Sequence, residues 1–239
     1  MSAALVTGSA SGIGSAIVAE LRAGGWDVLG VDVAEGADLR ADLTTRDGNR
    51  EAVQAAVGRL GRLDAVIPNA GVQHVAPVAD FPEDRWDQLI ALLLTSPFLL
   101  AKYAWPHLVA AGGGRFVVVA SVHGLVASPF KAAYVSAKHG VIGLVRTLAL
   151  EGAEHDIGAT AVCPGYVRTP LVEHQIAAQA EAHGVSEEAV LDEVILAPHA
   201  VKRLIEPEGV ARLVAMLLGP QGMAFTGVAL PMDYGWTAR

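Results

Sequence analysis

The chain of 239 residues is 52% hydrophobic, enough to bury a substantial core in a single domain over residues 1–239. Its formal net charge of −8 argues against nucleic acid and anionic membranes as partners and favours a small molecule. Cys163 is the one cysteine, so an internal disulfide is excluded, and no Cys/His cluster has the spacing of a metal site.

A strand, a glycine-rich turn and a helix are predicted at the start of the chain. Residues 3–7 are a β-rich run, and Gly8, Gly12 and Gly14 lead into an apolar helical pattern that stops at residues 24–25. Glycines allow close approach to a pyrophosphate, and the start of a helix offers free N–H groups. A glycine cluster alone is more often only a turn, but the strand before it and the helix after it indicate a dinucleotide site.

The next predicted strand, residues 26–32, ends at Asp32, roughly 20 residues after the glycine loop. A carboxylate there can bind the adenosine ribose hydroxyls and repel the 2′-phosphate of NADP. The loop carries no Arg or Lys to bind that phosphate, and Arg40 fits a solvated loop residue, so NAD is the expected cofactor. The alternative is that Asp32 only caps the strand and starts a turn.

Strands and helices alternate along the rest of the chain, which predicts an α/β fold with a parallel, doubly wound sheet and helices on both faces. Pro97 and Pro106 should kink or break the long helix. The region at about 170–200 follows the carboxyl end of a strand, where a substrate-covering lid belongs. The expected elements are a strand ending at 41–43, a helix over 47–60, strands over 64–68 and 115–120, a helix over 83–111, a helix to about residue 153, a strand over 159–163, a helix over 207–218 and a strand over 227–231.

The stretch 121–138 carries the strongest chemical signal. Tyr134 and Lys138 are four residues apart on a predicted helix, so their side chains leave one face a turn apart. A nearby ammonium lowers the pKa of a phenol from about 10, and such a tyrosine can exchange a proton with an alcohol or a carbonyl. Ser121 follows a predicted buried strand and can hold the reacting oxygen. Taken alone, the spacing fits an ordinary amphipathic helix better.

These features together resemble the short-chain dehydrogenase/reductase family over essentially the whole chain. The resemblance implies a Rossmann-type fold of about seven strands, a homotetramer, and hydride transfer between a nicotinamide and an alcohol carbon. Tyr134 would be the acid/base, Lys138 would lower its pKa and hold the nicotinamide ribose, and Ser121 would position the oxygen. The motifs that carry the resemblance are Thr7-Gly8-x-x-x-Gly12-x-Gly14, Asn69-Ala70-Gly71, Ser121, Tyr134-x-x-x-Lys138 and Pro164-Gly165.

The resemblance also implies a set of cofactor contacts along the chain. Asp42 would meet the adenine amino group and Thr169 the carboxamide. The full set is Thr7, Gly8, Ser11, Gly12, Ile13, Gly14, Asp32, Asp42, Leu43, Asn69, Ala70, Gly71, Tyr134, Lys138, Pro164, Gly165, Val167 and Thr169.

Within the family, the chain is most similar to bacterial D-3-hydroxybutyrate dehydrogenases, which hold a small carboxylate with polar side chains. A chain with net charge −8 needs a local cation to attract a hydroxy acid, and Lys131 with His123 would supply it. Alternatively, Lys131 is solvated and His123 is a loop residue. The expected substrate contacts are Gln73, Ser121, His123, Lys131, Tyr134, Tyr166, Gln175 and Trp236.

Two departures from these relatives bear on function. Leu93 stands where the family usually has an asparagine that supports a proton-relay water beside the catalytic lysine, so the relay must be rerouted or weakened. Tyr166 stands where the hydroxybutyrate enzymes tend to have tryptophan. We expect NAD-dependent oxidation of (R)-3-hydroxybutyrate to acetoacetate. The alternatives are another secondary alcohol, such as a polyol or a biosynthetic hydroxyl, and a dinucleotide-binding protein without turnover.

Hydropathy bears on assembly and location. The mean hydropathy of +0.41 is high for a soluble monomer, which favours apolar surface buried in a homo-oligomer. The first residues show no charged leader, and no uninterrupted run of 18 apolar residues is present, so we expect a cytoplasmic protein without a membrane span.

Overall fold

The computed structural model describes residues 1–238; Arg239, the last residue of the predicted domain, lies outside them. Within this range seven parallel strands form one sheet in the order β3-β2-β1-β4-β5-β6-β7, which confirms the predicted Rossmann-type α/β fold. The strands are β1 (Ala3–Thr7), β2 (Asp27–Asp32), β3 (Leu39–Arg40), β4 (Ala65–Ile67), β5 (Gly114–Val119), β6 (Ile157–Pro164) and β7 (Ala229–Met232).

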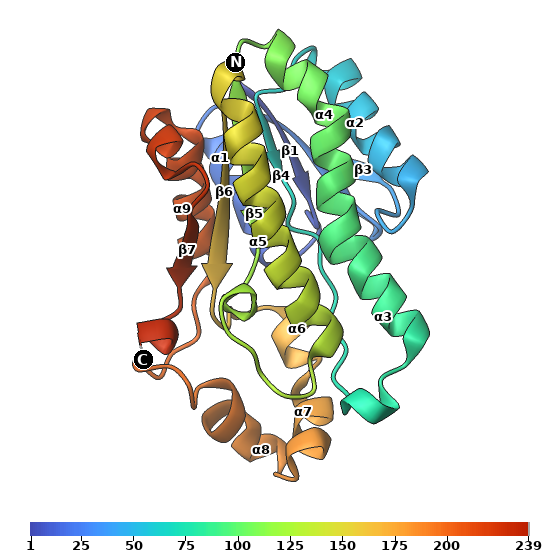
Figure 1. Ribbon diagram of the computed structural model, residues 1–239, viewed down its shortest axis with the longest axis vertical. Helices are drawn as coiled ribbons and strands as arrows, with labels where there is room; N and C mark the ends of the chain where they lie inside the picture. Colours follow the sequence, from blue (N-terminus) through green and yellow to red (C-terminus); the bar gives the residue numbers. More distant parts are fainter. Residues whose placement is uncertain (239) are drawn as a thin grey trace.

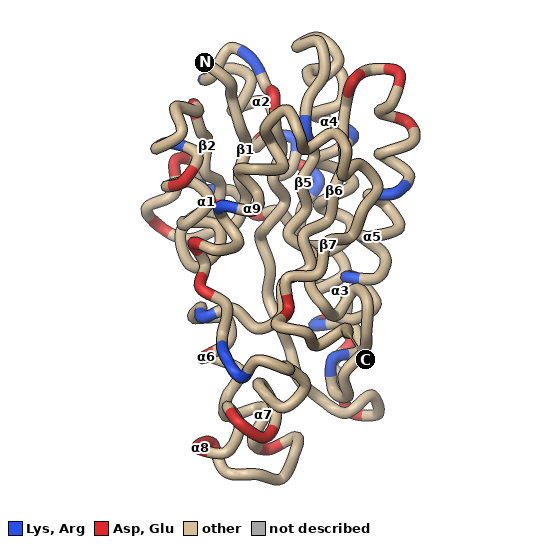
Figure 2. The backbone as a smooth tube through the Cα atoms, turned by 90° about the vertical axis from the view of Figure 1, so that its left-hand side faces the viewer, with Lys and Arg blue, Asp and Glu red and all other residues tan. Residues whose placement is uncertain are grey.

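Helices cover both faces of the sheet, because the central strands are apolar on both sides. Successive residues of β1 alternate between two cores: Val6 packs with α1 (Gly12–Ala23) and α9 (Pro207–Leu218), whereas Leu5 packs with the helices of the other face. Those helices are α2 (Arg46–Leu60), α4 (Ser96–Ala110) and α5 (Ala132–Gly152). Figures 1 and 2 show the resulting three layers.

The long helical region differs from the prediction. It runs without a break from Glu83 to Ala110 as α3 (Glu83–Ile90), a π-helical turn (Ala91–Thr95) and α4. Pro97 lies in the first turn of α4, where its missing N–H is tolerated, and Pro106 lies inside α4 without ending it. The sequence predicted that these prolines kink or break the helix, and the prediction of a break was wrong. The run could span a membrane by length and composition alone, but a buried core helix passes the same test, and Leu99, Leu100 and Leu108 are buried.

The strand β3 is shorter than predicted and ends before residues 41–43. Asp42 explains this, since its carboxylate accepts hydrogen bonds from the N–H and the hydroxyl of Thr44, at 2.9 and 2.7 Å. Such a side-chain turn directs the chain out of the strand and toward α2. Thr45 then caps α2 by accepting the N–H of Gly48 at 3.0 Å.

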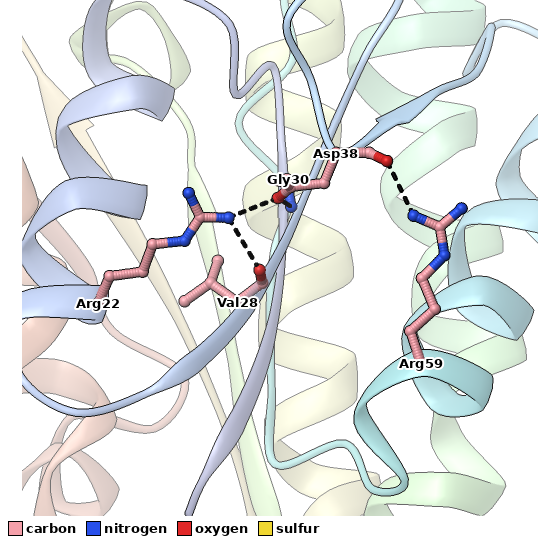
Figure 3. Close-up of polar contacts among 5 residues, drawn as sticks. All are labelled: Arg22, Val28, Gly30, Asp38 and Arg59. Carbon is pink, nitrogen blue, oxygen red and sulfur yellow. Dashed lines mark hydrogen bonds and ion pairs between the residues drawn. The ribbon is translucent and has the colours of Figure 1, made fainter.

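The contacts of Asp38, here called the Asp38 clamp, connect the loop after β2 to helices α1 and α2 (Figure 3). Asp38 accepts the N–H of Gly30 in β2 at 2.7 Å and forms an ion pair with Arg22 of α1 at 2.6 Å. Arg22 also donates to the carbonyl of Val28 at 3.2 Å, and Arg59 of α2 donates to the backbone carbonyl of Asp38 at 2.8 Å. The loop is therefore held from both sides at the edge of β2.

Short helices extend beyond the carboxyl ends of the strands, below the sheet in Figure 1. They pack around a small core of their own that includes Tyr166, Ala180, Val190 and Ile195. The elements are α6 (Pro170–Glu173), α7 (Ile176–His183), α8 (Glu187–Val190) and a π-helical turn (Leu191–Ile195). Short 3-10 turns elsewhere are Val78–Asp80, Val122–Gly124, Ala153–His155, Pro220–Phe225 and Trp236–Ala238.

Candidate active site

A cavity of about 750 Å³ opens at the carboxyl edge of the sheet. Parallel α/β sheets bind ligands at this edge, where strand order reverses about the first strand. The structure brings every predicted site residue to this cavity wall except Thr7 and Gly14. The predicted cofactor and substrate contacts therefore share one space.

The glycine loop after β1 forms one end of the cavity. Gly8 and Gly12 have φ of +67° and +52°, a backbone region that favours glycine. Ser11 precedes α1 but its side chain makes no capping hydrogen bond, so the first N–H groups of α1 remain available to a phosphate. This cradle, with Asp32 at the end of the next strand, fits a nicotinamide dinucleotide.

Thr7 and Gly14 shape this loop but do not line the cavity, so a direct contact of either residue with the cofactor stays a prediction. The buried Thr7 hydroxyl accepts the N–H groups of Asn69 and Ala70 at 3.0 and 3.1 Å. The Asn69 amide donates to the carbonyl of Thr7 at 2.9 Å. A Cβ on Gly14 would collide with the carbonyl oxygen of Gly8, so only glycine fits there. Both residues thus lock the loop to the end of β4.

Asp32 faces the cavity from the end of β2. Its carboxylate accepts the N–H of Ala10 at 3.0 Å and that of Ala34 at 3.1 Å. The side chain therefore does start a turn, as the alternative interpretation held, and it also lines the cavity. These two contacts fix the negatively charged Asp32 carboxylate in the cavity wall beside the glycine loop.

Tyr134, Lys138 and Ser121 meet near the middle of the cavity. Lys138 donates from Nζ to the carbonyl of Val119 at 2.9 Å and lies 5.6 Å from the centroid of the Tyr134 ring. Ser121 hydrogen-bonds the Tyr134 side chain and also accepts the N–H of His123 at 3.1 Å. Strand β5 and helix α5 thus aim the three groups at one another.

The pKa values of this group differ from the expectation. Burial raises the pKa of Tyr134, and only the hydrogen bond from Ser121 opposes that rise. Burial also lowers the pKa of Lys138 to about 8. The protein alone therefore does not supply the acidic phenol that the Tyr-x-x-x-Lys spacing predicted. Additional positive charge in the cavity is needed to favour the phenolate.

A cation and an aromatic wall form the far end of the cavity. Lys131 is buried, and its Nζ donates to the Tyr166 hydroxyl at 2.7 Å. Tyr166 stacks on Trp236 with ring centroids 5.7 Å apart and planes at 17°. Gln175 lines the same end, with its amide nitrogen on the carbonyl of Leu171 at 2.6 Å and its buried oxygen without a partner. The Lys131 ammonium can bind an acceptor-rich group here, whereas the free oxygen of Gln175 can only accept a hydrogen bond.

His123 is not a source of charge, which corrects the expectation. Burial, followed by the charge of Lys131, lowers the pKa of His123 to about 3. Its Nε2 lies 2.9 Å from the Ser128 hydroxyl, and its ring meets Trp236 edge-on at 5.2 Å. A neutral imidazole therefore packs the wall while Lys131, whose pKa burial lowers only to about 8, carries the positive charge.

Leu93 lies in an apolar cluster with Leu89, Ala133 and Ala137 and is almost fully buried. Its side chain offers no hydrogen bond to Lys138. A second cavity of about 10 Å³, room for one water molecule, separates the π-helical turn from Lys138 and includes Ser96 in its wall. Ser96 itself donates to the buried Asn49 at 2.7 Å.

Sequence reasoning missed several residues of the site. Asp84, Asp87 and Gln88 of α3 line the cavity mouth, but no local pattern shows which face of a polar helix turns inward. His199 was missed as well: it is fully buried, and its ring lies edge-on to Trp236 at 5.4 Å, behind the aromatic wall. Further lining residues outside the predicted set are Val33, Ala41, Thr44, Val72, Ala91, Leu92, Val119, Ala120, Pro170, Leu171 and Val172.

Comparison with known proteins defines the class. A family model described as short chain dehydrogenase matches residues 2–180, and the chain belongs to the short-chain dehydrogenase family. It is therefore an oxidoreductase that acts on a small molecule, and members of this family generally bind a nicotinamide cofactor.

Individual relatives cover nearly the whole chain. It is 41% identical to a D-beta-hydroxybutyrate dehydrogenase of Rhizobium meliloti over 254 positions, covering 99% of this chain and 98% of that protein. A D-beta-hydroxybutyrate dehydrogenase of Cupriavidus necator is 37% identical with the same coverage. A cis-4-hydroxycyclohexanecarboxylate dehydrogenase of Sinomonas cyclohexanicum is 34% identical over 98% of this chain and 96% of that protein.

Proposed function

We propose that the protein oxidises a short 3-hydroxy acid with NAD, and that (R)-3-hydroxybutyrate, which yields acetoacetate, is its substrate. The observation that carries this proposal is the buried ammonium of Lys131 at the end of the cavity that also holds Tyr134. An uncompensated buried cation is costly, and a substrate carboxylate would neutralise it. Gln73 and Gln175 would add neutral hydrogen bonds to the same carboxylate.

The residues would divide the reaction among them. Ser121 would hold the substrate hydroxyl, and Tyr134 as phenolate would take its proton. Lys138 would stabilise that phenolate and bind the nicotinamide ribose. NAD, when bound, would supply the hydride acceptor and a positive charge near Tyr134. Tyr166 and Trp236 would exclude water from the carboxylate end.

Two parts of the cavity rim would determine which cofactor binds and how the cavity closes over the substrate. Asp32 would bind the adenosine ribose and repel a 2′-phosphate, which supports NAD over NADP. The segment α6 to α8 lies over the carboxyl edge and would act as the lid, bringing Gln175 onto the substrate. We further propose a cytoplasmic homotetramer that binds neither nucleic acid nor membrane, in keeping with the net charge of −8.

Initial rates with NAD and NADP over a panel of alcohols test the proposal. The panel holds (R)- and (S)-3-hydroxybutyrate, cis-4-hydroxycyclohexanecarboxylate, 2-butanol and a polyol, with Tyr134→Phe as the inactive control. The (R)-hydroxy acid with NAD should give the highest kcat/KM. The cyclic acid is the second candidate, because a relative bears its name and it has the same carboxylate. Turnover of 2-butanol or the polyol as fast as the acids would refute the carboxylate site.

A further inference from the structure

Phe130, the residue before Lys131, has an unusual backbone. Its φ of +66° lies in the left-handed region, which an aromatic residue with a Cβ rarely adopts. Among the non-glycine residues at positions 1–238, only Asp156 and Tyr234 share a positive φ. Strained conformations persist only where surrounding contacts impose them, and they gather at functional sites. Phe130 does not line the cavity, so its effect must pass through its neighbours.

Two contacts hold Phe130 in this conformation, from two different segments. The N–H of Ala76, three residues after Gln73, donates to the Phe130 carbonyl at 3.0 Å. The ring meets the ring of His183 edge-on, with centroids 5.1 Å apart and planes at 88°. His183 is the last residue of α7. Phe130 therefore joins the loop of Gln73 to the helices that overlie the cavity.

The same backbone turn decides where Lys131 points. Lys131 immediately precedes α5, and its carbonyl accepts the N–H of Val135 at 2.9 Å, so its backbone is fixed on the helix side. On the other side, the left-handed turn at Phe130 sets the direction in which the chain enters. Lys131 then reaches the Tyr166 hydroxyl from within the cavity wall.

We propose that Phe130 is a positioning residue: it fixes the Lys131 ammonium at the carboxylate end of the cavity and couples it to α7 through His183. The proposal rests on the proposed function for its substrate. The preference for anionic over neutral alcohols would then depend on the contact between the rings of Phe130 and His183, although neither ring lines the cavity.

Three variants test this, with a matched control. Phe130→Gly keeps the positive φ but loses the ring, His183→Ala removes the ring's partner without changing the backbone at 130, and Phe130→Tyr keeps the ring contact. The control is Asp156→Gly, which replaces another positive-φ residue at the opposite end of the sheet, where its carbonyl accepts the N–H of Gly114 at the start of β5.

The first readout is the ratio of kcat/KM for (R)-3-hydroxybutyrate to that for 2-butanol. Phe130→Gly and His183→Ala should each lower this ratio by about three- to ten-fold, the range expected for loss of one aromatic pair, through KM of the acid. KM for NAD and kcat for 2-butanol should stay near wild type. Phe130→Tyr should preserve the ratio, and Asp156→Gly should not change it. The double variant should fall no further than the more impaired single variant, because one contact is lost in each.

The second readout needs no substrate. Hydrogen–deuterium exchange of residues 72–77 and 176–183 should quicken in Phe130→Gly and His183→Ala, and not in Asp156→Gly. If the wild type oxidises hydroxybutyrate but the ratio stays constant in both variants, the proposal is overturned, whatever the exchange shows. If the wild type does not oxidise hydroxybutyrate, the proposed function fails, and unchanged exchange in both variants would overturn the coupling separately. Faster exchange in both segments would support the coupling of Phe130 to α7 and to the loop of Gln73.

Discussion

Raising the pH from 7 to 9 should lower the protein's preference for acids over neutral alcohols by roughly ten-fold. Burial lowers the pKa of Lys131 to about 8, so its charge is lost as the pH rises through that value. The ammonium is then about 90% populated at pH 7 and about 10% at pH 9, which predicts a roughly ten-fold fall in carboxylate affinity. His123, neutral throughout this range, cannot compensate.

The assay compares kcat/KM for (R)-3-hydroxybutyrate with kcat/KM for 2-butanol at half-unit steps of pH. Both substrates need Tyr134 and Lys138, so titration of those groups cancels in the ratio, and kcat/KM reports the form of the enzyme that binds the alcohol. In Lys131→Arg, whose guanidinium keeps its charge, the ratio should not fall over this range. A wild-type ratio that stays level to pH 9.5 would show that the charge of Lys131 does not select the substrate.

Four further outcomes follow from the site. Tyr134→Phe should lower kcat by at least about 10²-fold while NAD still quenches tryptophan fluorescence; near-normal turnover would exclude its acid/base role. Asp32→Ala should raise the NADP-to-NAD ratio of kcat/KM by about ten-fold, from loss of one like-charge contact, and an unchanged ratio would contradict the cofactor assignment. Leu93→Asn should lower the free energy of unfolding by about 2–4 kcal/mol in urea, because an amide would replace a buried leucine packed among apolar side chains, and an unaltered midpoint would refute that explanation. His123 takes a proton in the unfolded chain below pH 6.5 but in the folded chain only near pH 3, so stability should fall by up to about 1.4 kcal/mol per pH unit below 6.5. His123→Gln should fall less steeply between pH 6 and 4; parallel curves would count against the buried neutral imidazole.

The sequence predicts the features whose geometry is local. Gly8 and Gly12 are needed by the backbone angles of their own turn, and the four-residue spacing places Tyr134 and Lys138 on one face whatever packs around them. The alternation of strands and helices likewise leaves few topologies open. The fold and the position of the glycine loop and of Tyr134 with Lys138 are therefore predictable from the order of the residues, whereas much of the cavity wall was expected only from the family resemblance.

Features that depend on burial could not be predicted in the same way. His123 has the residue type of a cation, but its enclosure by Trp236 and Lys131 makes it neutral. The pKa of Tyr134 rises because burial outweighs its polar neighbours. Pro97 is tolerated because it lies in the first turn of α4, just after a π-helical turn, and no sequence pattern reveals that boundary. In each case the behaviour of the residue depends on the surroundings that the folded structure creates, which the local sequence does not show.

The Asp38 clamp limits how this protein can be re-engineered. Its carboxylate completes the edge of β2 at Gly30 and neutralises Arg22, so it serves the sheet as much as the loop. Transplanting a phosphate-accepting loop from an NADP enzyme should therefore leave Asp38 in place. A graft that extends through position 38 would leave the N–H of Gly30 without its acceptor and Arg22 with the carbonyl of Val28 alone, so cofactor exchange would come with a weakened edge of β2.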